Sequence, residues 1–243
     1  MKKKSILSLV LVLAISFSSF TCFAQGEKKE KIILEKNNEI TDINVLIKRA
    51  EDGIDESRGK SRKCLKDMSK AIIKNKDTKE EVEVETKTTT QLLESSIENN
   101  IITNSFATTA ILSREDSGSS TGADVGATST IYWSEYTISS GGQQVPVVQL
   151  TRATGRWFIY QSGVVLSNLL TQGCQQGWRD PSGQVVDNAY WAVTSYTGYD
   201  MRYYFTPIEQ DSLWCLLSER MTCDWKRGTG STYTFEFVNC QSF

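Results

Sequence analysis

Histidine is absent from this 243-residue chain, and its absence excludes several kinds of catalytic site. A Ser-His-Asp triad, a Cys-His dyad and a zinc site with histidine ligands all need an imidazole. Acid–base chemistry would then depend on carboxylates, as in glycoside hydrolysis. No motif fixes a separation between any two carboxylates of residues 130–243, so we predict that they are solvated loop residues and that none is catalytic. The carboxylates concerned are Asp180, Asp187, Asp200, Glu209, Asp211 and Glu219.

Tryptophan and tyrosine are absent from the first 131 residues, although the chain has 6 Trp and 9 Tyr. All of them lie between Tyr132 and Tyr233. The chain is thereby divided into an apolar start, a charged stretch and an aromatic-rich part.

Residues 1–24 have the pattern of a secretory signal peptide. Lys2, Lys3 and Lys4 precede an apolar run from Ile6 to Ile15, and Ala24 offers a small residue for cleavage. A retained membrane anchor would need a longer apolar run. A lipoprotein would use Cys22 as the acylated residue, but the usual small and Leu residues just upstream of it are missing. We therefore expect cleavage after Ala24 and a secreted, extracellular product without a transmembrane anchor.

Residues 25–80 are rich in charges of both signs that nearly cancel, so the sequence predicts no basic patch for nucleic acid. Helical spacing predicts two helices. The first has Thr41 as its N-cap and an apolar face of Ile43, Leu46, Ile47, Ala50 and Ile54; the second has Leu65, Met68, Ile72 and Ile73. The segment is interpreted either as a charged, partly helical arm or as a propeptide cut near Arg58–Lys66. Cys64 would be an odd thiol there.

Residues 81–112 are predicted to form a β-hairpin. Val82, Val84 and Thr86 alternate with charged residues. Glu98-Asn99-Asn100 supplies a turn, because asparagine tolerates left-handed backbone geometry. Residues 113–129, with their Ser- and Gly-rich start, have the composition of a linker.

Residues 130–243 carry short alternating segments separated by turn residues, which predict an all-β domain: an antiparallel β-sandwich or barrel-like fold. Tyr233, Phe235 and Phe237, for example, share one face of a strand. The segment also holds four cysteines, and export makes disulfides plausible. The simplest pairing is Cys215 with Cys223 across a hairpin and Cys174 with Cys240. Without a Cys-x-x-Cys motif or histidine, no metal site is expected, and no motif indicates a cofactor.

The six tryptophans are many for one domain, and we expect about four of them to be buried. Trp178 is the strongest candidate for exposure, because it lies in the Gly-rich polar segment Gly173–Asp180, which is interpreted as a loop. An exposed indole beside the Arg179 guanidinium would suit a sugar ring, a phosphate-bearing wall polymer or a lipid headgroup. Trp178 and Arg179 are therefore the predicted binding residues.

Several segments of residues 80–243 resemble the geobacillin-type large secreted antimicrobial proteins of Gram-positive bacteria. The segments that carry the resemblance are Glu85–Thr90, Thr103–Thr108, Val148–Trp157 and Val164–Asn168. The resemblance implies a non-enzymatic, bacteriocin-like role and supplies no catalytic residue. Residues before 80 depart from that pattern.

Taken together, these features favour a secreted, non-enzymatic effector that acts by binding, with the bacterial cell envelope or a wall glycan as its expected partner. The alternatives are a secreted glycan-binding or adhesin-like module and a carboxylate-dependent cell-wall hydrolase.

Overall fold

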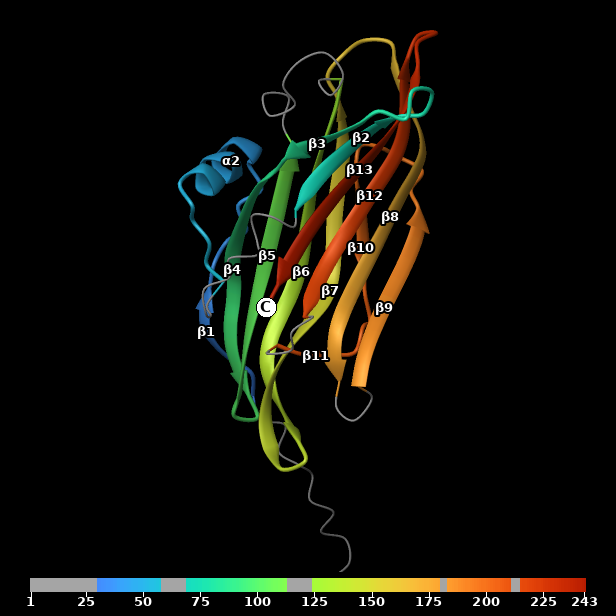
Figure 1. Cartoon of the computed structure of the whole chain (residues 1–243). Coiled ribbons are helices and arrows are strands. Elements are labelled where there is room, and N and C mark those ends of the chain that lie inside the picture. The colour runs from blue at the N-terminus through green and yellow to red at the C-terminus, as the bar shows by residue number, and fades with distance from the viewer. Residues whose placement is uncertain (1–29, 58–68, 113–123, 180–182, 211–214) are drawn as a thin grey trace, which may run out of the picture.

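The computed structural model describes residues 30–57, 69–112, 124–179, 183–210 and 215–243. One antiparallel sheet dominates it and curls into a half-barrel (Figure 1). The predicted signal peptide lies outside the described residues. Within those residues, no helix is long and apolar enough to cross a membrane.

The described residues form thirteen strands and one helix, and their bounds follow in chain order. They are β1 (Ile32–Lys36), α2 (Ile43–Glu51), β2 (Lys70–Asn75), β3 (Glu81–Glu85), β4 (Lys87–Glu98), β5 (Ile101–Leu112), β6 (Val125–Ser140), β7 (Gln143–Ile159), β8 (Val164–Arg179), β9 (Gly183–Ala192), β10 (Tyr199–Arg202), β11 (Ile208–Glu209), β12 (Leu216–Arg227) and β13 (Thr232–Ser242).

The sheet has two halves that face each other. One half follows the order β1-β4-β5-β6-β7, with β10 also paired to β7; the other follows β8-β12-β13-β2-β3, with β9 also paired to β8. The short strand β11 pairs with both β7 and β8 and joins the halves. Across the interior, β13 lies against β5 and β6. The expected all-β, sandwich- or barrel-like class is confirmed.

Two apolar clusters fill the space between the halves. One includes Trp157, Trp225, Phe235 and Phe237, and the other includes Trp133. Trp191 is half-buried and Trp178 is exposed, so three of the five described tryptophans are buried. Trp214 lies outside the described residues.

A band of buried polar side chains separates the two clusters; we name it the central polar band. It consists of Thr108, Ser129, Thr171, Glu219 and Asn239, all fully or almost fully buried. Along β12 the inward side chains run from Leu217 in one cluster through Glu219 to Met221 in the other. Buried polar groups need partners, and here most of the bonds join the two halves of the sheet, as when Ser129 of β6 donates to Glu219 of β12.

The charged N-terminal arm is folded onto the sheet. The predicted first helix exists as α2, but its N-cap is Asp42 rather than Thr41. The Asp42 carboxylate accepts hydrogen bonds from the Asn44 and Val45 amides, which satisfies two backbone donors at the helix start. Gln91 fixes the segment before the helix, because its side-chain amide bonds both the N–H and the C=O of Ile40.

The prediction of a second helix is wrong where the structure describes it. Ile72 and Ile73 lie in strand β2, which pairs with β13 on one side and β3 on the other. Ala71 and Ile73 are buried while Ile72 is half-buried, a period of two. Pairing with strands distant in sequence therefore overrides the helical spacing. Leu65, Met68 and Cys64 lie outside the described residues.

The expected turn at Asn99 and Asn100 is present, with φ angles of 52° and 65°. The hairpin that it closes is β4–β5 and begins at Lys87, not at residue 81. Residues 81–85 form β3 and pair with β2 instead. Strand β6 begins at Val125, within the predicted linker, and the hairpin and the C-terminal part share one sheet.

The predicted disulfides are not formed. Cys174 and Cys240 both pair with Ser218, one from each side, so about 10 Å of sheet separates their backbones, beyond the reach of a disulfide. Cys215 directly precedes β12 and Cys223 lies within it, so they are eight residues apart on an extended segment. The residues between them, which suggested a hairpin, are the middle of one strand.

This geometry leads to a prediction about thiol chemistry. Peptide mapping of air-purified protein under non-reducing conditions should find neither a Cys174–Cys240 nor a Cys215–Cys223 bridge. Cys223 should react with thiol reagents only after unfolding, because burial raises its pKa to about 12 and the thiolate is the reactive form. Recovery of either bridge from the native protein would contradict the observed topology.

Candidate binding surface

The outer face of β8 and β9 carries a strip of uncharged side chains, which we name the β8–β9 strip. Side chains alternate along a strand: Thr171, Gly173, Gln175 and Gly177 are buried, while the residues between them face outward. Strand β9 alternates in the same way. The strip consists of Leu170, Gln172, Cys174, Gln176 and Trp178 on β8 and of Gln184, Val186, Asn188, Tyr190 and Ala192 on β9.

Two aromatic side chains mark the strip. Trp178 is 48% exposed and Tyr190 is 69% exposed. Tyr190 is opposite Gln172, and Trp178 is opposite Gln184. Gln172 and Trp178 are six residues apart on β8, so the two rings are about 20 Å apart along the strand. Leu170 and Val186 are also exposed. Four large apolar side chains are therefore exposed on one face of two neighbouring strands.

Amide side chains lie between the aromatic residues. Gln172 Nε2 donates to Asn188 Oδ1 and to the Tyr190 hydroxyl, both at 2.9 Å. Tyr190 is thereby held in place although it is exposed. Amide groups supply both donors and acceptors, so the strip combines ring faces with neutral hydrogen-bonding groups.

A groove of about 350 Å³ lies at the Tyr190 end of the strip. Its walls come from three strands: Leu170, Thr171 and Gln172 of β8, Tyr190 of β9, and Arg220 and Thr222 of β12. Arg220 contacts Glu236 on β13, so the one charged wall residue is already paired. The groove is therefore suited to a neutral ligand.

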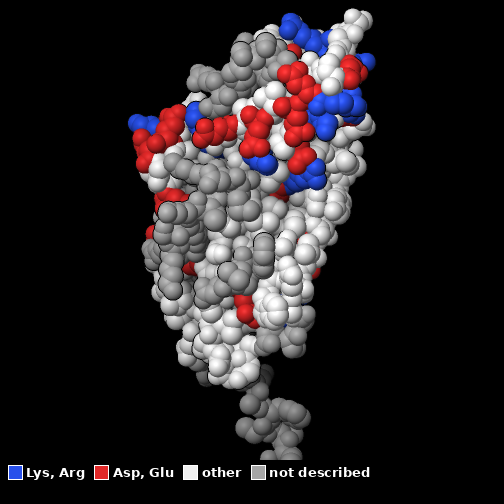
Figure 2. All heavy atoms as spheres, viewed as in Figure 1, with Lys and Arg blue, Asp and Glu red and all other residues white. Residues whose placement is uncertain are grey.

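Charge is distributed unevenly over the same half of the sheet. On β2 and β3, Lys70 pairs with Glu83 and Lys74 with Glu81 across the strands. Figure 2 shows Lys, Arg, Asp and Glu gathered in the upper part of the view, and few of them on the described surface that is visible lower down. The β8–β9 strip itself contains no charged residue, and in this it differs from the ion-paired surface of β2 and β3.

The structure exposes Trp178, as expected, but does not place Arg179 beside it. Both belong to β8, so consecutive side chains point to opposite faces. The Arg179 guanidinium donates to Asp187 Oδ2 at 2.8 Å and to the Thr206 carbonyl at 3.0 Å. The indole therefore belongs to the strip, and the guanidinium belongs to a structural contact on the other face.

The segment Gly173–Arg179 is a strand rather than the predicted loop, and its glycines explain the error. A Cβ at Gly173 would lie 2.3 Å from Cζ of Tyr203, and one at Gly177 would lie 2.8 Å from Cδ1 of Ile208. These glycines let residues that follow β9 pack flat against β8. They indicate close packing and not a turn. Asp180 lies outside the described residues.

The carboxylates considered for catalysis are dispersed. Asp187 pairs with Arg179, Asp200 forms a two-bond pair with Arg152, and Glu209 lies in β11. Asp180 and Asp211 lie outside the described residues. Glu219 is not a solvated loop residue: it is fully buried in the central polar band, where Ser129 and Thr171 donate to its two oxygens at 2.8 and 2.6 Å.

Burial raises the pKa of Glu219 to about 7, against the opposing effect of the hydrogen bonds from Thr171 and Ser129. The Tyr199 and Tyr203 hydroxyls lie near the same carboxyl and also lower its pKa, but neither forms a hydrogen bond of ordinary geometry with a described residue. A raised pKa suits a general acid. Glu219 nevertheless has no exposed surface through which a polysaccharide could reach it.

Two further carboxylates line a cleft of about 410 Å³ beside β4, namely Glu35 and Glu56. The pKa of Glu56 is lowered: burial opposes this shift, but the Arg49 guanidinium and the Leu92 amide bond the carboxylate and outweigh it. A general acid needs a raised pKa. Glu56 is therefore not suited to act as a general acid.

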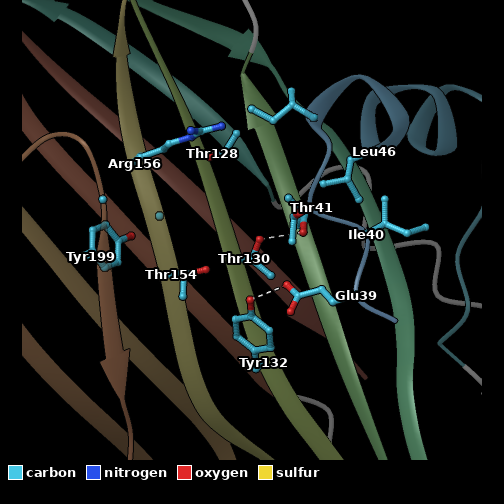
Figure 3. Close-up of a pocket in the computed structure, with 14 residues that line it drawn as sticks. Glu39, Ile40, Thr41, Leu46, Thr128, Thr130, Tyr132, Thr154, Arg156 and Tyr199 are labelled. Carbon is cyan, nitrogen blue, oxygen red and sulfur yellow. Dashed lines mark hydrogen bonds between the residues drawn. The ribbon is translucent and has the colours of Figure 1, made fainter. Parts of the chain in front are cut away.

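A second cleft, of about 380 Å³, lies between the N-terminal arm and the threonine-rich outer face of β5, β6 and β7 (Figure 3). The Tyr132 hydroxyl donates to Glu39 at 2.6 Å, and Thr109 and Thr130 bond each other at 2.8 Å. Arg152 lies over the Tyr132 ring while pairing with Asp200. Much of this polar lining is paired internally, which favours a role in seating the arm.

Reasoning from the sequence did not find Tyr190, Val186 or Leu170 as surface residues. The alternation of residues 183–192 could have indicated that Val186 and Tyr190 share a face, but not that this face is the outer one.

No family model matches the chain, and neither the curated proteins nor the solved structures that were compared with it give a match.

Proposed function

We propose that this protein is a secreted, non-catalytic binding protein that recognises a neutral glycan of the bacterial cell envelope through the β8–β9 strip. The observation that carries the proposal is the placement of Trp178 and Tyr190 on an uncharged strip lined with amide side chains. Aromatic faces stack on sugar rings, and amides bond sugar hydroxyls. The separation of the rings, about 20 Å, suits an oligosaccharide better than a single sugar.

The Lys-led apolar segment at residues 1–24 supports secretion, and the sequence resemblance supports a bacteriocin-like effect. Binding and growth inhibition are separable. A glycan binder is retained by isolated wall polysaccharide whether or not it inhibits growth, whereas a bacteriocin-like protein inhibits related Gram-positive strains when applied pure to their lawns.

Replacing Tyr190 or Trp178 with alanine should each weaken binding to wall polysaccharide by about 1–2 kcal/mol, the contribution of one interfacial aromatic anchor. Thermal stability should change little, because both side chains lie on the exposed face of the sheet. Titration calorimetry with purified polysaccharide and melting temperatures of the same samples measure the two quantities.

Tyr204→Ala is the matched control, because Tyr204 is 91% exposed and lies outside the strip. It should leave the affinity unchanged. Equal affinity losses for Tyr204→Ala and Tyr190→Ala, or retention on anionic lipid vesicles but not on polysaccharide, would contradict glycan recognition by the strip. A stability loss of about 3–5 kcal/mol in Trp178→Ala would place that indole in the core instead.

A further inference from the structure

Strand β1 forms one margin of the sheet. It pairs with β4 through Ile32–Ile97, Ile33–Ser96 and Glu35–Ser95, and a register shift between Ile33 and Glu35 skips Leu34. In the part of the chain that the structure describes, no strand pairs with its other edge. An open edge offers a row of backbone donors and acceptors to another chain. The edge of β1 is therefore a surface on which a further strand would fit.

The side chains of β1 are unusually apolar for an open edge. All five of its residues are exposed, including Ile32, Ile33 and Leu34. Ile32 continues a row with Ile97 on β4 and Ile102 on β5. Exposed aliphatic side chains on an unpaired edge are an aggregation hazard in a monomer, and a strand added to β1 would cover them.

The sequence around β1 is complementary to itself when two copies run antiparallel. Residues 30–36 read Glu-Lys-Ile-Ile-Leu-Glu-Lys. With Ile33 opposite Ile33 of a second copy, Ile32 meets Leu34, Lys31 meets Glu35 and Glu30 meets Lys36. Every charged residue thus faces the opposite charge, and every apolar residue faces an apolar one. Such cross-strand pairs stabilise antiparallel sheets.

We infer that the protein forms a two-fold symmetric dimer in which the β1 edges of two copies pair antiparallel about Ile33. A self-complementary patch is what a two-fold interface requires. The pairing joins two sheets into one and continues the aliphatic row across the symmetry axis. In Figure 1, β1 and β9 lie at opposite sides of the molecule, so the dimer leaves both β8–β9 strips uncovered. The inference does not depend on what the strips bind.

A charge-swap experiment tests the pairing and its register. Glu30→Lys and Lys36→Glu should each raise the dimer dissociation constant about tenfold, because each places two like-charged pairs across the axis. The double variant Glu30→Lys/Lys36→Glu should return it to the wild-type value. Sedimentation velocity over a wide concentration range measures the constants. Lys31 is left unchanged because it already contacts Glu94 within one chain.

Cysteine cross-linking gives a second readout that does not depend on affinity. Opposite residues of an antiparallel pair have Cα atoms about 4.5–5.5 Å apart, within disulfide range. Ile33→Cys should therefore form a 33–33 bridge on mild oxidation. Ile32→Cys should not, because diagonal neighbours lie about 7–8 Å apart.

Four results would overturn the inference. A monomer at every concentration would mean that the skipped residue Leu34 and the flanking lysines keep the edge unpaired. A dimer indifferent to both single charge variants would place the interface elsewhere. Single variants that weaken the dimer without rescue by the double variant, or a bridge at residue 32 and not at 33, would refute the register.

Discussion

Replacing Glu219 with glutamine should stabilise the protein at pH 8 relative to wild type by about 3 kcal/mol more than it does at pH 4. The amide has almost the same shape as the carboxyl and cannot ionise. Burial raises the folded-state pKa of Glu219 from 4.5 to about 7, and each tenfold change in an acid dissociation constant corresponds to about 1.4 kcal/mol. The side chain is fully buried, so solvent screens this energy little.

The sign of the effect follows from the raised pKa. Below about pH 4.5 the carboxyl is protonated in both the folded and the unfolded chain, so its ionisation costs no stability there. As the pH rises from 4.5 to 7, the unfolded chain loses this proton while the folded chain keeps it, and wild-type stability falls. Above about pH 7 both states are ionised, and the full cost remains. The glutamine variant lacks this dependence.

Urea unfolding of both proteins at pH 4, 6 and 8 measures the difference directly. Other titrating groups affect both proteins alike, so their contributions cancel. Among them are Asp224, whose pKa Lys76 lowers against the effect of burial, and Asp200, whose pKa Arg152 lowers. A stability difference that is constant between pH 4 and pH 8 would show that Glu219 has an ordinary pKa and that water reaches it.

Replacing Asn239 with aspartate should cost about 3–5 kcal/mol of folding free energy, the scale of an uncompensated buried charge. Asn239 is fully buried. Its Nδ2 donates to the carbonyl oxygens of Thr108 and Ser129, both at 2.9 Å. These carbonyls belong to β5 and β6, so one amide from β13 joins the two halves of the sheet across the interior. Aspartate has no donor for them.

The new carboxylate would also lie beside another acid, because Asn239 is the direct cross-strand partner of Glu219. Two buried acids on neighbouring strands disfavour each other's ionisation. The loss should therefore be greater at pH 8 than at pH 4. Differential scanning calorimetry at both pH values measures it.

Asn188→Asp is the control for this substitution, since Asn188 lies on the exposed face of β9. It should change stability by less than about 0.5 kcal/mol. Similar losses for Asn188→Asp and Asn239→Asp would mean that the amide bridge between the halves contributes nothing to stability.

The central polar band, which contains Glu219 and Asn239, could not be recognised from the sequence. Ser129, Thr171, Glu219 and Asn239 are polar residues in strands that otherwise alternate in the ordinary way. Polar residues at inward positions resemble outward ones when only composition and spacing are considered. Their burial follows from the curl of the sheet, which brings β6 opposite β12 and β13.

The sequence by itself determined the class of this fold and several of its local features. Alternating side chains dictate strands wherever one face is buried, which is why Tyr233–Phe237 was predicted correctly as part of β13. The turn at Asn99 and Asn100 and the helix from Ile43 follow from residues adjacent in the chain.

Tertiary structure decided everything that depends on distant partners. Ile72 and Ile73 became a strand because β13 and β3 pair with them. Cys174 and Cys240 were kept apart by Ser218. Trp178 and Arg179 point to opposite faces because the glycine-rich segment that contains them is a strand. Its glycines are explained only by the tertiary structure, in which Tyr203 and Ile208 pack closely against that strand.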